Sequence, residues 1–163
     1  MDITNKFFSV RTVNYSLLTF SMISLCIACE KEKYSDETII RYGTSFGECI
    51  GYCSTNLEIK NAGISFSKSG WDKENELPEI TCMQDISSAE WDKLLKLIDL
   101  REFEFLPDII GCPDCADGGA EWIEVKNDSF DHKITFEYNN SPPEIEDFIK
   151  KIRSLHKAFS DSL

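Results

Sequence analysis

The chain has 163 residues, of which 42% are hydrophobic and 28% are charged, and its formal net charge is −12. This composition is typical of a globular protein and excludes an intrinsically disordered chain. The excess of acids argues against nucleic-acid binding, because binding to a phosphate backbone requires a surplus of Lys and Arg. It also argues against electrostatic attachment to anionic lipid.

The N-terminal stretch has the pattern of a secretory signal. Residues 1–16 carry Lys6 and Arg11, and the uncharged run LLTFSMISLCIA follows at 17–28. Twelve apolar residues are too few for a membrane-spanning helix, which needs about 20, but they fit the apolar core of a signal peptide. We therefore predict a signal peptide over residues 1–28, and a short buried helix is the alternative.

The predicted signal ends at a cysteine. The sequence LCIAC places the small residue Ala28 directly before Cys29. This pattern resembles the lipobox of bacterial lipoproteins, although Cys26 stands where that motif usually has Leu. The resemblance implies cleavage before Cys29, lipidation of Cys29, and anchoring in the cell envelope, with the outer membrane expected; acyl chains anchor such a protein stably. The charged residues 29–37 are then a tether that is too polar to pack.

Alternating apolar and polar residues predict strands in the first half of a single domain, which spans 38–160. We expect one strand at 37–45 and a hairpin at 55–68, and the stretch 78–84 is a further candidate strand. The apolar spacing of residues 87–100 predicts an amphipathic helix. Ser87 and Glu90 have the spacing of a capping box at its start.

The second half of the domain predicts another hairpin and another helix. Residues 121–127 and 132–139 alternate as paired strands, and residues 141–159 carry a helical apolar stripe. Ser141 is the expected N-cap, with Pro142 at the first helical position. The sequence thus predicts an α+β two-layer sandwich, in which two amphipathic helices cover an antiparallel sheet of about five strands in the order β-β-β-α-β-β-α.

Seven cysteines are present, and the spacing of four of them suggests disulfides. Cys49 and Cys53 form a C-x3-C pair, and Cys112 and Cys115 form a C-x2-C pair. In an exported protein such pairs are expected to be oxidised and to staple their loops. The sequence leaves local and crossed connectivity open. Cys82 lies among apolar residues and is expected to be a small buried side chain, with a bond to one of the other four still open.

Two other roles for these four cysteines remain as alternatives. Four thiolates can hold a structural zinc ion, but 58 residues separate Cys53 from Cys112, far more than in a zinc ribbon. The sequence CPDC could form a redox centre, which requires a thiol with a low pKa. The neighbouring acids Asp114, Asp117 and Glu121 would raise that pKa.

The same acids are weak candidates for a cation site. Asp114, Asp117 and Glu121 could provide oxygen ligands to calcium, but the chain has no D-x-D-x-D-G loop. A turn at Asp117-Gly118-Gly119 is the preferred interpretation. The two histidines, His132 and His156, have no Ser or Cys at a motif spacing, and we expect both at the surface or at a helix end. No cofactor and no catalytic group is therefore predicted.

Two stretches carry a resemblance to a family. YGTSFGECIGYC and GCPDCADGGAEWIEV resemble an uncharacterised domain of small exported lipoproteins of Bacteroidota, and the likeness covers residues 38–158. The resemblance implies a location and a fold but no activity. We predict a lipid-anchored cell-envelope protein that binds an unknown protein or small molecule without catalysis. The alternative is a thiol-redox or zinc-binding protein that uses the two cysteine pairs.

Overall fold

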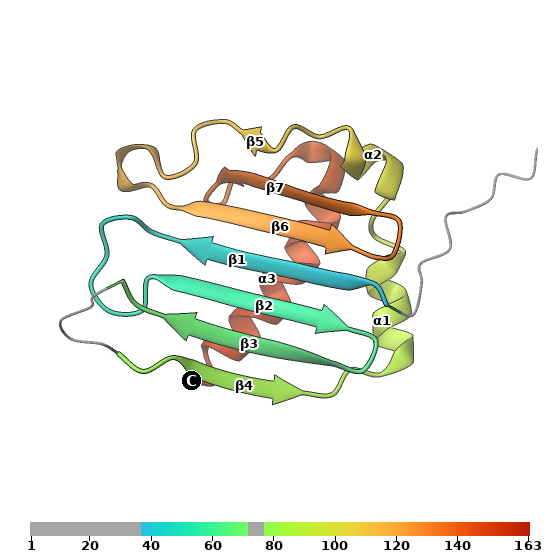
Figure 1. Ribbon diagram of the computed structural model, residues 1–163, viewed down its shortest axis with the longest axis horizontal. Coiled ribbons are helices and arrows are strands. Elements are labelled where there is room, and N and C mark those ends of the chain that lie inside the picture. Colours follow the sequence, from blue (N-terminus) through green and yellow to red (C-terminus); the bar gives the residue numbers. More distant parts are fainter. Residues whose placement is uncertain (1–36, 72–76) are drawn as a thin grey trace, which may run out of the picture. The chain divides into compact units, whose positions relative to one another are not determined.

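Seven strands pair into one open sheet in the part of the chain that the computed structural model describes, residues 37–71 and 77–163. The strand order across the sheet is β4-β3-β2-β1-β6-β7-β5 (Figure 1). All neighbours are antiparallel except β5, which runs parallel to β7. The strands are β1 (Ile39–Ser45), β2 (Ser54–Lys60), β3 (Gly63–Ser69), β4 (Ile80–Gln84), β5 (Ile109–Ile110), β6 (Ala120–Lys126) and β7 (Asp131–Glu137).

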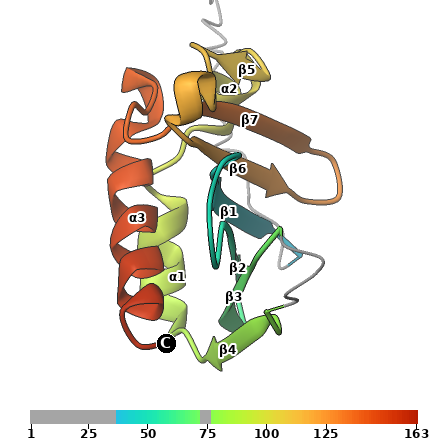
Figure 2. The ribbon, with the colours of Figure 1, turned by 90° about the vertical axis from the view of Figure 1, so that its left-hand side faces the viewer.

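Three α-helices and two short 3-10 helices complete the described part of the chain. The α-helices are α1 (Ser88–Leu95), α2 (Leu100–Glu104) and α3 (Glu146–Ser160), and the 3-10 helices are η1 (Cys115–Asp117) and η2 (Pro143–Ile145). Figure 2 shows α1 and α3 together on one face of the sheet. No helix of the described residues is long and apolar enough to cross a membrane.

The hydrophobic core lies between this face and the helices. Alternate strand residues point toward the helices and are almost fully buried; they include Tyr42, Leu57, Phe66, Ile123 and Phe136. The helices contribute Trp91, Leu94, Phe148, Ile149 and Ile152, which are also buried. Apolar residues at every second strand position therefore pack against apolar residues that recur about every 3.6 positions along the helices, and the two sets form one apolar layer.

The predicted fold, an antiparallel sheet of about five strands with two helices in the order β-β-β-α-β-β-α, is wrong. The sheet has seven strands, it is mixed, and three α-helices accompany it. The strand β5 was missed because its two residues are too few to show alternation. It exists only through its pairing with β7, in which Ile109 lies opposite Thr135. The strand β4, at the other edge of the sheet, pairs with β3.

The helix boundaries also differ from the expectation. The capping box of Ser87 and Glu90 starts α1 as predicted, but α1 ends at Leu95 and not at residue 100. A new helix, α2, begins after Asp99, whose carboxylate accepts hydrogen bonds from the first turn of α2. An N-cap residue has an extended backbone, and that of Asp99 therefore separates α1 from α2. Likewise η2 precedes α3, so Ser141 is not the N-cap of the last helix.

The predictions for the N-terminal region concern residues that the structure does not describe. The predicted signal peptide at 1–28, the lipidation residue Cys29 and most of the tether at 29–37 lie outside the described residues. The first described residue is Glu37, two positions before the first residue of β1.

Candidate functional site

Four loops lie together at the end of the sheet where β1 finishes. Ser45, the last residue of β1, is paired with Ser54 at the start of β2 and with Ala120 at the start of β6. Antiparallel pairing therefore brings the loops 46–53 and 111–119 to the same end of the strands (Figure 1, left). The described loop residues after β3, at 70–71, and after β7, at 138–142, lie at this end too. We call these four loops the loop end.

Two local cysteine pairs lie within disulfide distance at the loop end. Cys49 and Cys53 have Cα atoms 5.6 Å apart, and those of Cys112 and Cys115 are 5.5 Å apart. Both values fit the usual range for a disulfide. The connectivity is therefore local, and each pair closes its own loop. Cys53 is buried, whereas Cys112 and Cys115 are both exposed.

The two stapled loops are also hydrogen-bonded to each other. The Asp114 carboxylate accepts hydrogen bonds from the backbone N–H of Gly47, at 3.3 Å, and from that of Gly119, at 3.2 Å. Gly119 has a φ of +81°, and a Cβ there would collide with the ring of Phe46. Asp114 therefore acts as a structural acceptor between the loops, and Gly119 makes room for an aromatic ring of the opposite loop.

Aromatic side chains gather at the loop end. The indole Nε1 of Trp71 donates a hydrogen bond to the Phe46 carbonyl oxygen at 2.7 Å, and the rings of Phe46 and Tyr138 meet edge to face at 5.0 Å. We call Phe46, Trp71 and Tyr138 the aromatic cluster. Trp71 is 51% exposed and Tyr138 is 40% exposed, and Ile50 at the tip of the loop 46–53 is fully exposed. Exposed aromatic residues of this kind are enriched in protein interfaces.

The three acids that were candidate cation ligands make separate contacts. Asp114 binds backbone N–H groups, Asp117 is exposed within η1, and Glu121 is fully buried on the core face of β6. Residues 37–71 and 77–163 contain no group of three or more side chains that could hold a metal ion. The four paired cysteines likewise lie as two separate pairs.

Glu121 instead forms a buried ion pair with α3. The Arg153 guanidinium donates hydrogen bonds to both carboxylate oxygens, at 2.8 to 3.1 Å. The backbone N–H of Asn139 donates to the same carboxylate at 3.1 Å. Burial lowers the pKa of Arg153, but the hydrogen bond and charge of Glu121 outweigh burial, so the pKa lies above its usual value. The signal in the sequence was the position of Arg153, four residues after Ile149 on the apolar stripe.

His156 is a second polar side chain of α3 that contacts the sheet. Its Nε2 lies 2.7 Å from the Thr55 hydroxyl, which lies 2.7 Å from the Thr44 hydroxyl. The His156 ring also packs edge-on against the rings of Tyr42 and Phe66. Burial lowers the pKa of His156 to about 4, so the ring is neutral at pH 7. His156 lies near the end of α3, and it is partly buried because its ring packs against the sheet.

His132 is also less exposed than expected. Its side chain is 17% exposed, and its Nε2 lies 3.0 Å from the Leu106 carbonyl oxygen. The ring packs edge-on against Phe103 of α2. His132 therefore holds the segment between α2 and β5 against the sheet, which is a structural role.

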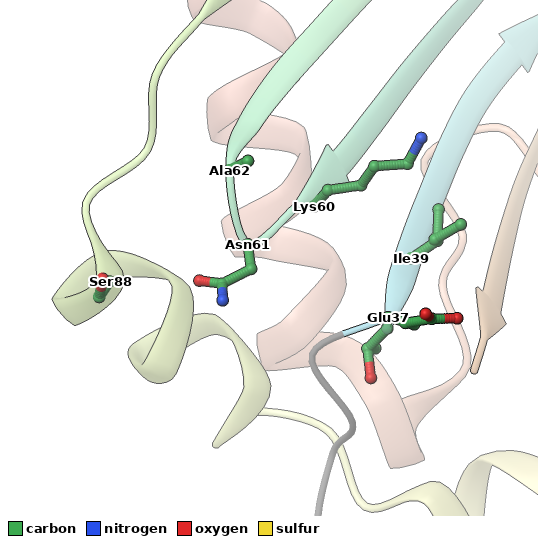
Figure 3. Close-up of a pocket in the computed structure, with 7 residues that line it drawn as sticks. Glu37, Ile39, Lys60, Asn61, Ala62 and Ser88 are labelled. Carbon is green, nitrogen blue, oxygen red and sulfur yellow. The ribbon is translucent and has the colours of Figure 1, made fainter. Parts of the chain in front are cut away.

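An open pocket lies at the start of β1 and at the turn between β2 and β3, away from the loop end. Figure 3 shows the side chains that line it. Its volume is about 660 Å³, and it is wide open to solvent. The amine of Lys60, one of its polar groups, is already paired with Glu58. The pocket therefore offers no convergent set of reactive groups. Its lining residues are Glu37, Thr38, Ile39, Lys60, Asn61, Ala62 and Ser88.

No family model and no curated protein matches this chain. The resemblance to a lipoprotein domain therefore stays a prediction.

Proposed function

We propose that this protein is a lipid-anchored protein of the bacterial cell envelope that binds a partner protein through its loop end, without catalysis. The observation that carries the proposal is the aromatic cluster, in which the exposed side chains of Trp71 and Tyr138 contact Phe46 of a loop that is closed by a cysteine pair. Loops that are fixed before binding lose little conformational entropy when a partner docks. Binding residues are also commonly found on loops that a rigid scaffold positions.

The whole length of β1 separates the loop end from the point where the described chain begins. Thr38 lies directly before β1, and the loop 46–53 follows its last residue, Ser45. A strand of seven residues spans roughly 23 Å. The loop end is therefore at the far end of the sheet from Glu37.

The chemistry of the loop end defines the kind of partner. Ile50, Trp71 and Tyr138 provide the exposed apolar surface, and Trp and Tyr are the residues most often found to dominate interface energies. Glu48 and Asp117 are exposed acids on the same two stapled loops. The partner that fits is a protein surface with an apolar centre and a basic rim.

Partner binding can be tested with matched substitutions of exposed apolar residues. Ile50→Asp and Tyr138→Ala change the loop end, whereas Phe105→Ala and Ile109→Ala change side chains outside it that are 86% and 67% exposed. The full-length protein, expressed in its envelope, is chemically cross-linked and purified. We expect the loop-end variants to lose the cross-linked partner and the control variants to retain it. Equal retention by all four variants, or equal loss, would contradict the proposal.

The anchor needs a separate test. Cys29→Ser should abolish labelling of the protein with a radioactive fatty acid and release it from the membrane fraction, because the lipid attachment atom is gone. Ile50→Asp should leave labelling unchanged. Wild-type protein that takes up no label would contradict the anchor. The binding test is independent of this result.

A further inference from the structure

Among the described residues, the outer edge of β4 has no paired strand. Within the described residues β4 lies at one end of the sheet and pairs only with β3. An edge strand presents a row of backbone N–H and C=O groups that another strand can use. Natural proteins usually block such an edge with Lys, Pro or a bulge. The sequence of β4 is ITCMQ, which has neither Lys nor Pro and carries no charge.

The register shows which backbone groups of β3 face β4. A two-residue turn at 61–62 joins β2 to β3, so Lys60 and Gly63 form a hydrogen-bonded pair. Hydrogen-bonded and non-hydrogen-bonded pairs alternate along an antiparallel ladder. Ile64 and Phe66 occupy the non-hydrogen-bonded positions of the ladder between β2 and β3. Their backbone N–H and C=O groups therefore point toward β4.

The same alternation fixes the free groups of β4. Phe66 is paired with Cys82 and Ile64 with Gln84. The backbone N–H and C=O groups of Cys82 and Gln84 are therefore hydrogen-bonded to β3. Thr81 and Met83 lie between these positions, and their backbone N–H and C=O groups point away from the sheet. Both side chains are exposed on the open face, and Met83 is 80% exposed.

We propose that β4 pairs antiparallel with β4 of a second copy of this chain, centred on Cys82, to form one continuous sheet through two copies. In this register the backbone of Thr81 bonds to that of Met83 in the second copy, and the reverse pair forms by symmetry. The edge is therefore self-complementary about a two-fold axis, as an isologous interface requires. Every outward backbone group of Thr81 and Met83 is satisfied without a change in the fold.

Two further features fit a second copy as the occupant. The five residues of β4 carry no charge, so no like charges meet within the paired strands. Cys82, the midpoint, has no disulfide partner among the described residues. Glu79 and Asp85 flank β4 and face each other between the copies, and like charges opposite each other weaken a sheet. Added salt should therefore strengthen the dimer.

The first test measures the oligomeric state of the full-length protein in mild detergent by sedimentation. Thr81→Glu/Met83→Glu places acids opposite each other across the proposed edge. Ser65→Glu/Ser67→Glu adds the same charge to the same face, but on the interior strand β3. We expect the wild type and the β3 variant to dimerise, and the dimer dissociation constant of the β4 variant to rise about tenfold or more. A wild type that remains monomeric, or two variants that respond equally, would overturn the proposal.

The second test reads the register. Thr81→Cys and Met83→Cys are made separately in a Cys82→Ser background, and the two proteins are oxidised alone and as a mixture. The mixture should give a cross-linked dimer, because residues 81 and 83 lie opposite each other at about 5.5 Å. Each protein alone should cross-link poorly, because equal positions are two residues out of register. Efficient cross-linking of either variant with itself, or a different protein captured at β4 in place of the second copy, would overturn the proposal.

Discussion

His156 gives the folded chain a specific pH dependence. Its pKa is lowered by burial from 6.5 to about 4, so the unfolded chain takes up this proton before the folded chain does. The stabilisation is therefore complete above pH 6.5 and is lost as the pH falls toward 4. Because part of the ring is accessible to solvent, we expect a loss of about 2 kcal/mol in the free energy of unfolding over this range.

Urea denaturation at several pH values within that window measures the effect. His156→Gln removes the titrating ring, so its free energy of unfolding should depend less on pH than that of the wild type. A variant with the same pH dependence as the wild type would show that other groups cause the acid sensitivity.

The buried pair of Glu121 and Arg153 predicts a second single-residue effect. Arg153→Met leaves the fully buried Glu121 carboxylate without its cation, and we expect a loss of about 3 kcal/mol in stability. The double variant Glu121→Gln/Arg153→Met should be less destabilised than the sum of the two single variants, because no buried charge remains. Thermal or urea denaturation of the four proteins tests this, and additive effects would contradict it.

Among the elements, the sequence predicted those whose signals are local. The capping box at Ser87 and Glu90 marked the start of α1, and the buried stripe of α3 at Phe148 and Ile149 follows helical spacing. The strand β5 could not be predicted, because two residues show no period and its pairing with β7 is a long-range contact. The cap at Asp99 that separates α2 from α1 was a local signal that an apolar stripe concealed.

The two cysteine pairs should differ in how readily they are reduced. Cys112 and Cys115 are exposed, whereas Cys53 is buried, and a thiol reductant needs access to a sulfur atom. We expect mild reduction to open Cys112–Cys115 first. Because each pair closes a very short ring, its loss should cost at most about 2 kcal/mol. Alkylation and mass spectrometry along a reductant series measure the order. Simultaneous opening, or collapse of the whole fold at the first step, would contradict it.

At the scale of the whole molecule, the candidate site depends on topology. The cysteine pairs were visible in the sequence, but Trp71 and Tyr138 carried no signal that linked them to Phe46. These three residues meet because β1, β3 and β7 all end at the same end of the sheet. Conversely, Glu121 was a candidate cation ligand at the start of an expected strand, and the alternation along β6 places its side chain in the core. The sequence therefore located the staples but not the surface that they support.

Site-specific photocross-linking in intact cells tests most directly whether the loop end of the anchored protein contacts a partner. A photoreactive amino acid is placed at Ile50 in the loop end or at Ile109 in β5, both of which are exposed. We predict one discrete adduct with another protein from position 50 and none from position 109. The absence of an adduct at position 50, or the same adducts from both positions, would contradict the claim.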